Sequence, residues 1–177
     1  MPSKNNSEES ESKKVELRNL QSLLNKSINK ELTVVKYETT NLLPDGENYA
    51  STILKVEAEV KKTKNSSKET LSLVAKMTPT LEFRKDIFNA TASFKKEIYI
   101  FEKLLPIYRQ LEKEAGIEDK DLIDILPKFY GGRLSLKEEI PSKADEDVTL
   151  LMENIQCQGY QMMNKKQGNH RFIKNTQ

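Results

Sequence analysis

A lysine inside an apolar stretch and a glutamate on a later amphipathic segment are residues whose types and spacing suggest chemistry. Lys76 lies in LSLVAKM, a run that is otherwise typical of a buried strand. An ammonium group there is costly unless it meets a carboxylate or a solvated cleft. Glu97 lies beside Phe94 and Ile98, on or near the apolar face of an expected helix. We therefore predict that Lys76 and Glu97 face each other. A solvated edge lysine with a surface glutamate is the alternative, and Glu102 is a second candidate partner off the apolar stripe.

The stretch LPDGENYAS at residues 43–51 has two interpretations. Its Pro-Asp-Gly sequence is a strong turn signal in front of a long alternating run. The small residues Ala50 and Ser51 open that run. They fit either an ordinary hairpin or a loop whose backbone N–H groups lie against a phosphate. The residues of this stretch alone leave both interpretations open.

The periodicity of the chain predicts an α+β fold in which one antiparallel sheet packs on a long helix. A disordered leader is expected at 1–14 and a first helix at 15–30. The long helix should hold Phe94 to Leu105, with Pro106 kinking or interrupting it. A short helix is expected around Phe83 to Phe88. Strands are expected at about 32–42, 49–61, 69–77, 129–136 and 148–153.

Composition excludes several classes of protein. The 177 residues suit one domain, and their formal net charge is only +2, which argues against a nucleic-acid binder. Cys157 is the single cysteine, so a reducing compartment is expected. The first residues lack the apolar core of a signal peptide, and no stretch is long and apolar enough for a membrane span. We therefore expect a cytoplasmic protein with no membrane partner.

Five motifs occur in an order that resembles the ecdysteroid-kinase-like family, also called CHK kinase-like, whose members are distant relatives of choline and aminoglycoside kinases. The resemblance covers about residues 17–168. It implies a protein-kinase-like amino-terminal lobe and interlobe linker over 15–168, followed by a divergent tail at 169–177. The motifs are GENYAS (46–51), LVAKMTP (73–79), FKKEIYIFEKLLP (94–106), LPKFYGG (126–132) and VTLLMENIQCQGY (148–160).

The resemblance implies a nucleotide site built from three segments. The first hairpin would cover the phosphates, Lys76 would reach the α- and β-phosphates, and an ion pair with Glu97 would hold it. The linker backbone would meet the adenine edge, although an ordinary core strand ending at Asn154 is the alternative. The nucleotide-binding residues implied are Asn48, Ala50, Ser51, Lys76, Glu97, Met152, Glu153 and Asn154.

The same resemblance implies ATP and Mg²⁺ for the full-length family, with a steroid-like or small alcohol as the phosphate acceptor. Phosphoryl transfer needs carboxylates that this fold supplies after the linker, but no acidic residue follows Glu153. His170-Arg171 is followed by Phe172, where a catalytic loop would carry aspartate. We therefore expect a truncated kinase without catalytic or metal-binding residues, which binds ATP weakly or not at all and transfers no phosphate. A non-catalytic interaction module and an unrelated α+β binding domain are the alternatives.

Overall fold

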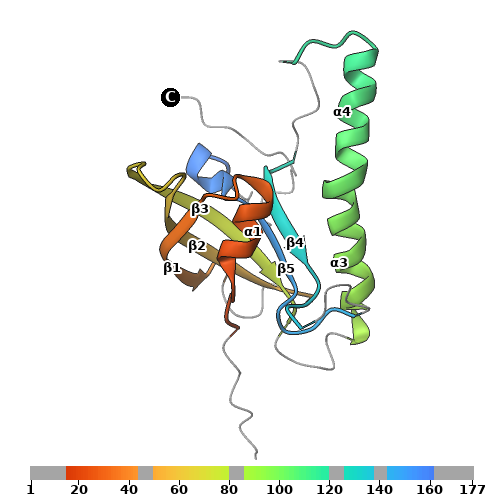
Figure 1. The fold of residues 1–177 in the computed structure, drawn as a ribbon. Coiled ribbons are helices and arrows are strands. Elements are labelled where there is room, and N and C mark those ends of the chain that lie inside the picture. The colour runs from red at the N-terminus through yellow and green to blue at the C-terminus, as the bar shows by residue number, and fades with distance from the viewer. Residues whose placement is uncertain (1–14, 44–49, 80–85, 120–125, 138–142, 162–177) are drawn as a thin grey trace, which may run out of the picture.

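The computed structural model describes residues 15–43, 50–79, 86–119, 126–137 and 143–161 (Figure 1). The leader expected at 1–14 and the tail expected at 169–177 lie outside these ranges. The first half of the short helix expected around Phe83 to Phe88 also lies outside them, since the description resumes at Asp86.

One five-stranded antiparallel sheet forms the centre of the fold, as predicted. Its strand order is β1-β2-β3-β5-β4, so the last strand of the chain lies between β3 and β4. β2 alternates between buried and half-buried residues, whereas the first three residues of β5 are all buried. The strands are β1 (Thr33–Asn41), β2 (Thr52–Lys61), β3 (Lys68–Met77), β4 (Phe129–Arg133) and β5 (Thr149–Glu153).

The first helix, α1 (Leu20–Ser27), is shorter than the expected 15–30. It begins after Asn19, whose side chain accepts a hydrogen bond from the amide of Ser22 at 3.3 Å. The residues before it are held against the sheet, because Leu17 is buried and its carbonyl accepts a hydrogen bond from the Tyr37 hydroxyl at 2.6 Å. This tertiary contact competes with a first helical turn, and the helix therefore starts later than its periodicity suggests.

The long helix continues past Pro106, but its regular α-helical turns are interrupted directly before the proline, where we expected a kink or an interruption. It consists of α3 (Ala90–Tyr99), a π-helical segment η1 (Ile100–Leu104) and α4 (Leu105–Glu114). Proline lacks the N–H of a regular turn and its ring crowds the carbonyl four residues earlier. The wider π turn, in which the Leu105 amide bonds the Ile100 carbonyl, accommodates the proline inside the helix.

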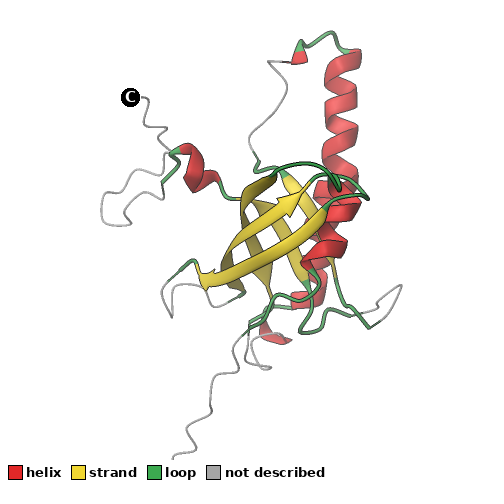
Figure 2. Ribbon diagram, turned by 60° about the vertical axis from the view of Figure 1, so that its left-hand side comes forward, coloured by secondary structure: helices red, strands yellow, loops and turns green. Residues whose placement is uncertain are grey.

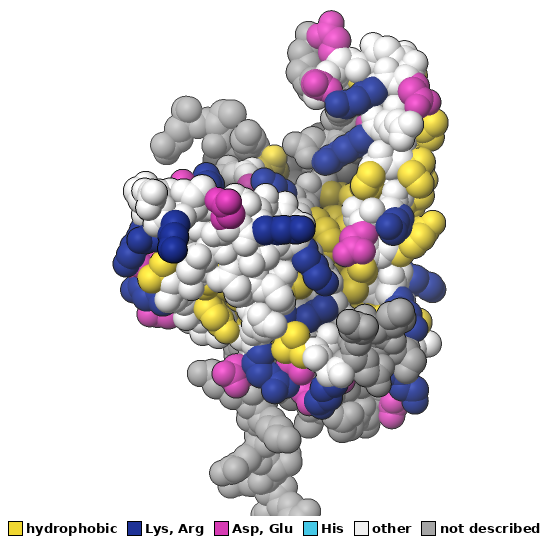
Figure 3. All heavy atoms as spheres, viewed as in Figure 1, with side chains coloured by type: hydrophobic (Ala, Val, Ile, Leu, Met, Phe, Trp, Pro, Cys, Tyr) yellow, Lys and Arg dark blue, Asp and Glu magenta, His cyan; other side chains and the backbone are white. Residues whose placement is uncertain are grey.

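The helices cover opposite faces of the sheet. Leu151 packs in the cluster that contains the leucines of α1, whereas its neighbour Leu150 packs in the cluster that contains Phe94 of α3. Figure 1 shows α1 across the front of the sheet and α3 to its right, and Figure 2 shows the long helix beside the sheet from a second direction. The far end of the long helix extends beyond the sheet, and hydrophobic side chains show along it (Figure 3). Ile107 and Leu111 of α4 are about half exposed.

Two adjacent glycines in β4 allow both helices to approach. A Cβ atom at Gly131 would lie 3.3 Å from the Leu23 carbonyl oxygen of α1. A Cβ atom at Gly132 would lie 2.7 Å from Ile98 Cγ1 of α3, closer than atoms can pack. Gly132 therefore fixes how near α3 comes to the sheet.

We expect Gly132→Ala to lower the free energy of unfolding by about 1–3 kcal/mol, because the new methyl group overlaps Ile98, whose β-branched side chain has little rotamer freedom in a helix. Denaturant unfolding measures the loss. In a double-mutant cycle, Ile98→Ala should recover part of it by removing the overlapping atoms. Strictly additive losses would show that Gly132 does not set this contact.

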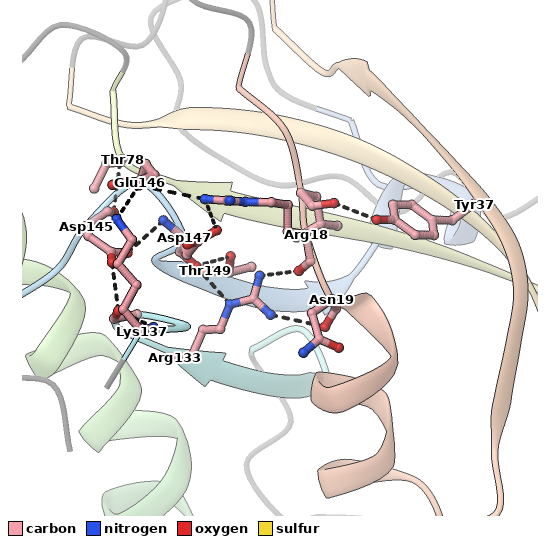
Figure 4. A network of polar contacts seen from close by, with 12 residues as sticks. Arg18, Asn19, Tyr37, Thr78, Arg133, Lys137, Asp145, Glu146, Asp147 and Thr149 are labelled. Carbon is pink, nitrogen blue, oxygen red and sulfur yellow. Dashed lines mark hydrogen bonds and ion pairs between the residues drawn. The ribbon is translucent and has the colours of Figure 1, made fainter. Parts of the chain in front are cut away.

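A buried arginine links the residues directly before α1 to the loop before β5 through hydrogen bonds (Figure 4). Arg133 is only 8% exposed, and its guanidinium donates to the backbone carbonyls of Asp147, Asn19 and Arg18. Burial lowers the pKa of Arg133. Arg18 Nη2 in turn lies 2.7 Å from the buried carboxylate of Asp147. The network joins α1, the end of β4 and the start of β5 on one side of the sheet.

Candidate functional site

The predicted pair between Lys76 and Glu97 is confirmed. Lys76 Nζ lies 2.6 Å from Glu97 Oε1 and 2.8 Å from Oε2, so one ammonium group contacts both carboxylate oxygens. Their side chains are 24% and 29% exposed, which places the pair at the boundary between core and solvent. The Phe94 ring centroid lies 5.6 Å from the same nitrogen. Glu97, and not Glu102, is the partner of Lys76.

Alternation along β3 places Lys76 on the α3 side of the sheet. Its neighbours Ala75 and Met77 are buried in the cluster on the α1 side, so the side chain of Lys76 points the other way. Phe94, one turn before Glu97, is buried against that same side. The strand and the helix therefore present the two charged groups to each other.

Ser93 is a member of the site that sequence reasoning missed. Its hydroxyl donates to Glu97 Oε1 at 3.2 Å, from one turn earlier in α3. Glu97 therefore accepts hydrogen bonds from the Lys76 ammonium and from the Ser93 hydroxyl. The spacing of four residues on a helix was the available signal, because such residues lie on the same face.

Strand register brings the three predicted segments together around Lys76. Lys76 pairs with Ile53 of β2 on one side and with Leu150 of β5 on the other. Ile53 lies shortly after Ala50 and Ser51, and Leu150 lies shortly before Met152. The end of the first hairpin, the lysine and the last residues of β5 therefore lie on neighbouring strands.

The hairpin residues differ in accessibility. Ala50 is exposed, whereas Ser51 is buried at 5% exposure. Asn48 lies outside the described residues. The contact of this hairpin with phosphate stays a prediction.

The predicted linker residues are partly engaged within the protein. The Glu153 amide donates to the Lys128 carbonyl at 2.8 Å, and the Asn154 amide donates to the Ser72 carbonyl at 3.2 Å. Met152 and Glu153 are half-buried and Asn154 is buried. An adenine contact from this segment therefore has to use other backbone groups than these two amides.

Two further properties concern only the described part of the chain. No three His, Cys, Asp or Glu side chains gather there as a candidate metal-binding cluster. In the same ranges, no helix has the length and apolar character needed to cross a membrane.

The fold and the site together define a class. A five-stranded antiparallel sheet, with a helix after β3 that carries the partner of a β3 lysine, is the arrangement of a kinase-like amino-terminal lobe. Residues 45–172, more than half of the chain, match the ecdysteroid kinase-like family. The chain belongs to this family. Searches of curated proteins and of solved structures give no significant match.

Proposed function

We propose that this chain forms the nucleotide-binding lobe of an ATP-dependent kinase that phosphorylates a hydroxyl group of a steroid-like or other small alcohol. The observation that carries the proposal is the Lys76–Glu97 pair, in a chain that belongs to the ecdysteroid kinase-like family. The family is described as ecdysteroid kinase-like, which supports a steroid-like alcohol as the phosphate acceptor.

The geometry of the pair suits a phosphate anchor. A lysine ammonium has three donors, and Glu97 accepts through both of its oxygens. One donor is then available for a phosphate oxygen at the solvent boundary. Because Glu97, which itself accepts from the Ser93 hydroxyl, holds the ammonium in place, little side-chain entropy is lost when a phosphate binds. Ala50, Ser51 and the segment Met152–Asn154 would contribute the remaining contacts.

The 177 residues supply the binding elements without an acid after Glu153. We therefore propose that this chain by itself binds ATP weakly and transfers no phosphate. General-base and charge-stabilising groups each contribute orders of magnitude to the rate, and their joint absence removes the transfer step.

A calorimetric titration with ATP and Mg²⁺, followed by an assay of ADP release with ecdysteroid and choline acceptors, tests both statements. The expected result is a saturable ATP signal with no acceptor-dependent ADP release. Absence of ATP binding at millimolar concentrations would refute the proposed function and favour a non-catalytic interaction module. Acceptor-dependent turnover that requires Lys76 would contradict the inactivity of these residues alone.

A further inference from the structure

We infer that Asn154 is a positioning residue whose side chain, through Ser72 and Glu57, fixes the segment that follows β5. The role in nucleotide binding rests on the proposed function, which places this segment against the base. The side-chain contacts themselves are independent of that function.

Three elements are joined by one chain of hydrogen bonds. Asn154 Nδ2 donates to Ser72 Oγ of β3 at 3.1 Å, and Ser72 Oγ donates to Glu57 Oε1 of β2 at 2.7 Å. Ser72 and Glu57 are direct partners in the strand register. The Asn154 amide also donates to the Ser72 carbonyl at 3.2 Å, so Ser72 holds Asn154 through both its backbone and its side chain.

The direction of these bonds is determined by charge. The Ser72 hydroxyl first, and then Lys55 at 2.9 Å from Oε1, lower the pKa of Glu57, so its carboxylate is ionised at neutral pH. An ionised carboxylate only accepts, so the single hydroxyl proton of Ser72 points to Glu57. Ser72 Oγ is then an acceptor toward Asn154, which requires the NH₂ side of the carboxamide to face it.

The oxygen of the Asn154 carboxamide caps the helical turn that follows. Asn154 Oδ1 accepts from the Gln156 amide at 3.2 Å and caps the short 3₁₀ helix η3 (Ile155–Gln158). The Cys157 amide bonds the Asn154 carbonyl at 3.2 Å. Because Asn154 is only 3% exposed, water cannot replace a lost partner without rearrangement. The position of η3 therefore depends on Ser72.

The single cysteine provides a reporter of that position. Cys157 is exposed and lies within η3, so a trifluoromethyl label on its sulfur gives one ¹⁹F resonance from the full chain. Ser72→Ala should shift and broaden this resonance, because Asn154 Nδ2 loses its acceptor. Ser72→Thr keeps the hydroxyl and should restore the resonance. Ser135→Ala is the matched control, since Ser135 Oγ also donates to a carboxylate, Asp145 Oδ2 at 2.7 Å, and follows the end of β4 that pairs with Thr149, at the opposite end of β5 from Asn154.

Nucleotide affinity gives the second readout. Ser72→Ala should weaken adenosine and ATP equally, by about fivefold, which corresponds to one hydrogen bond of ordinary strength. The affinity for tripolyphosphate should not change, because Lys76 is untouched. A general loss of structure would instead weaken all three ligands.

The outcomes separate the two proposals. An unchanged ¹⁹F resonance in a folded Ser72→Ala variant would overturn the positioning role, whether or not ATP binds. If Ser72→Ala fails to fold, Glu57→Ala, which removes the acceptor from a half-buried position, should produce the same shift in smaller degree, and no shift there would also overturn it. A shifted resonance in a chain that binds no ATP would support the positioning role and refute the proposed function.

Discussion

Lys76→Met is expected to lower the affinity for ATP by about ten- to a hundredfold, with no change in the affinity for adenosine. A charge-assisted hydrogen bond to a phosphate contributes about 1.5–3 kcal/mol, and methionine keeps the length of the side chain without its charge. The loss of the ammonium also leaves the Glu97 carboxylate near the phosphates as a repulsive charge. Calorimetric titration of both ligands with the variant measures the difference.

The double variant Lys76→Met/Glu97→Gln distinguishes the two causes. The double variant should bind ATP more tightly than Lys76→Met, because the repulsive carboxylate of Glu97 is gone. It should still bind ATP more weakly than the unmodified chain, because the contact between the ammonium and the phosphate is missing. Lys36→Met is the matched control, because the exposed Lys36 of β1 also pairs with a carboxylate, that of Glu59 on β2 at 3.0 Å, away from the candidate site. Equal losses of ATP affinity in Lys36→Met and Lys76→Met would indicate general electrostatic attraction and contradict a specific anchor.

Arg133→Met should lower the free energy of unfolding by about 3 kcal/mol, the loss expected when a buried charged donor is removed from its acceptors. The guanidinium of Arg133 donates to three backbone carbonyls, and the bond to the Asp147 carbonyl is buried while those to Asn19 and Arg18 are part-buried. Methionine fills the space of the stem but leaves these carbonyls without their donor. Chemical denaturation at neutral pH measures the change.

Lys137→Met is the matched control for this variant. Lys137 Nζ lies 2.6 Å from Glu146 Oε1, close to the same network, but both side chains are more than half exposed. An exposed pair contributes less than about 1 kcal/mol. If Arg133→Met lowers the free energy of unfolding as little as Lys137→Met does, the network of Figure 4 does not hold α1, β4 and β5 together.

Much of the sheet and the central ion pair could be predicted because both depend on local patterns. Alternation in β2 and the continuous apolar run of β5 fixed which residues face inward. Lys76 stood out as a charge in an apolar strand, and the helical position of Glu97 beside Phe94 provided its partner. Each of these signals lies within one element.

The features that were missed depend on contacts between elements. The start of α1 is set by the contact of Leu17 with Tyr37, which helical periodicity cannot reveal. The π turn before Pro106 keeps the helix intact, although proline usually favours a break. Arginine is usually a surface residue, and only the assembled fold brings three backbone carbonyls to the guanidinium of Arg133.

The engagement of Asn154 shows the same limit at the candidate site. The family resemblance implied that the backbone of residues 152–154 meets a nucleotide, but no pattern in the sequence indicated that Ser72 would bind both the side chain and the amide of Asn154. Pairing between β2, β3 and β5 creates that contact from residues far apart in the chain.

The central claim, that Lys76 contacts the phosphates of a nucleotide, is tested most directly with an ATP analogue whose terminal phosphate carries an acyl group. A lysine amine held beside the phosphates attacks the acyl carbon and releases ATP, and mass spectrometry then locates the acylated residue. We expect Lys76 to be acylated well above the other lysines, and excess ATP to suppress this labelling. Labelling spread over the exposed lysines, with no protection of Lys76 by ATP, would contradict it.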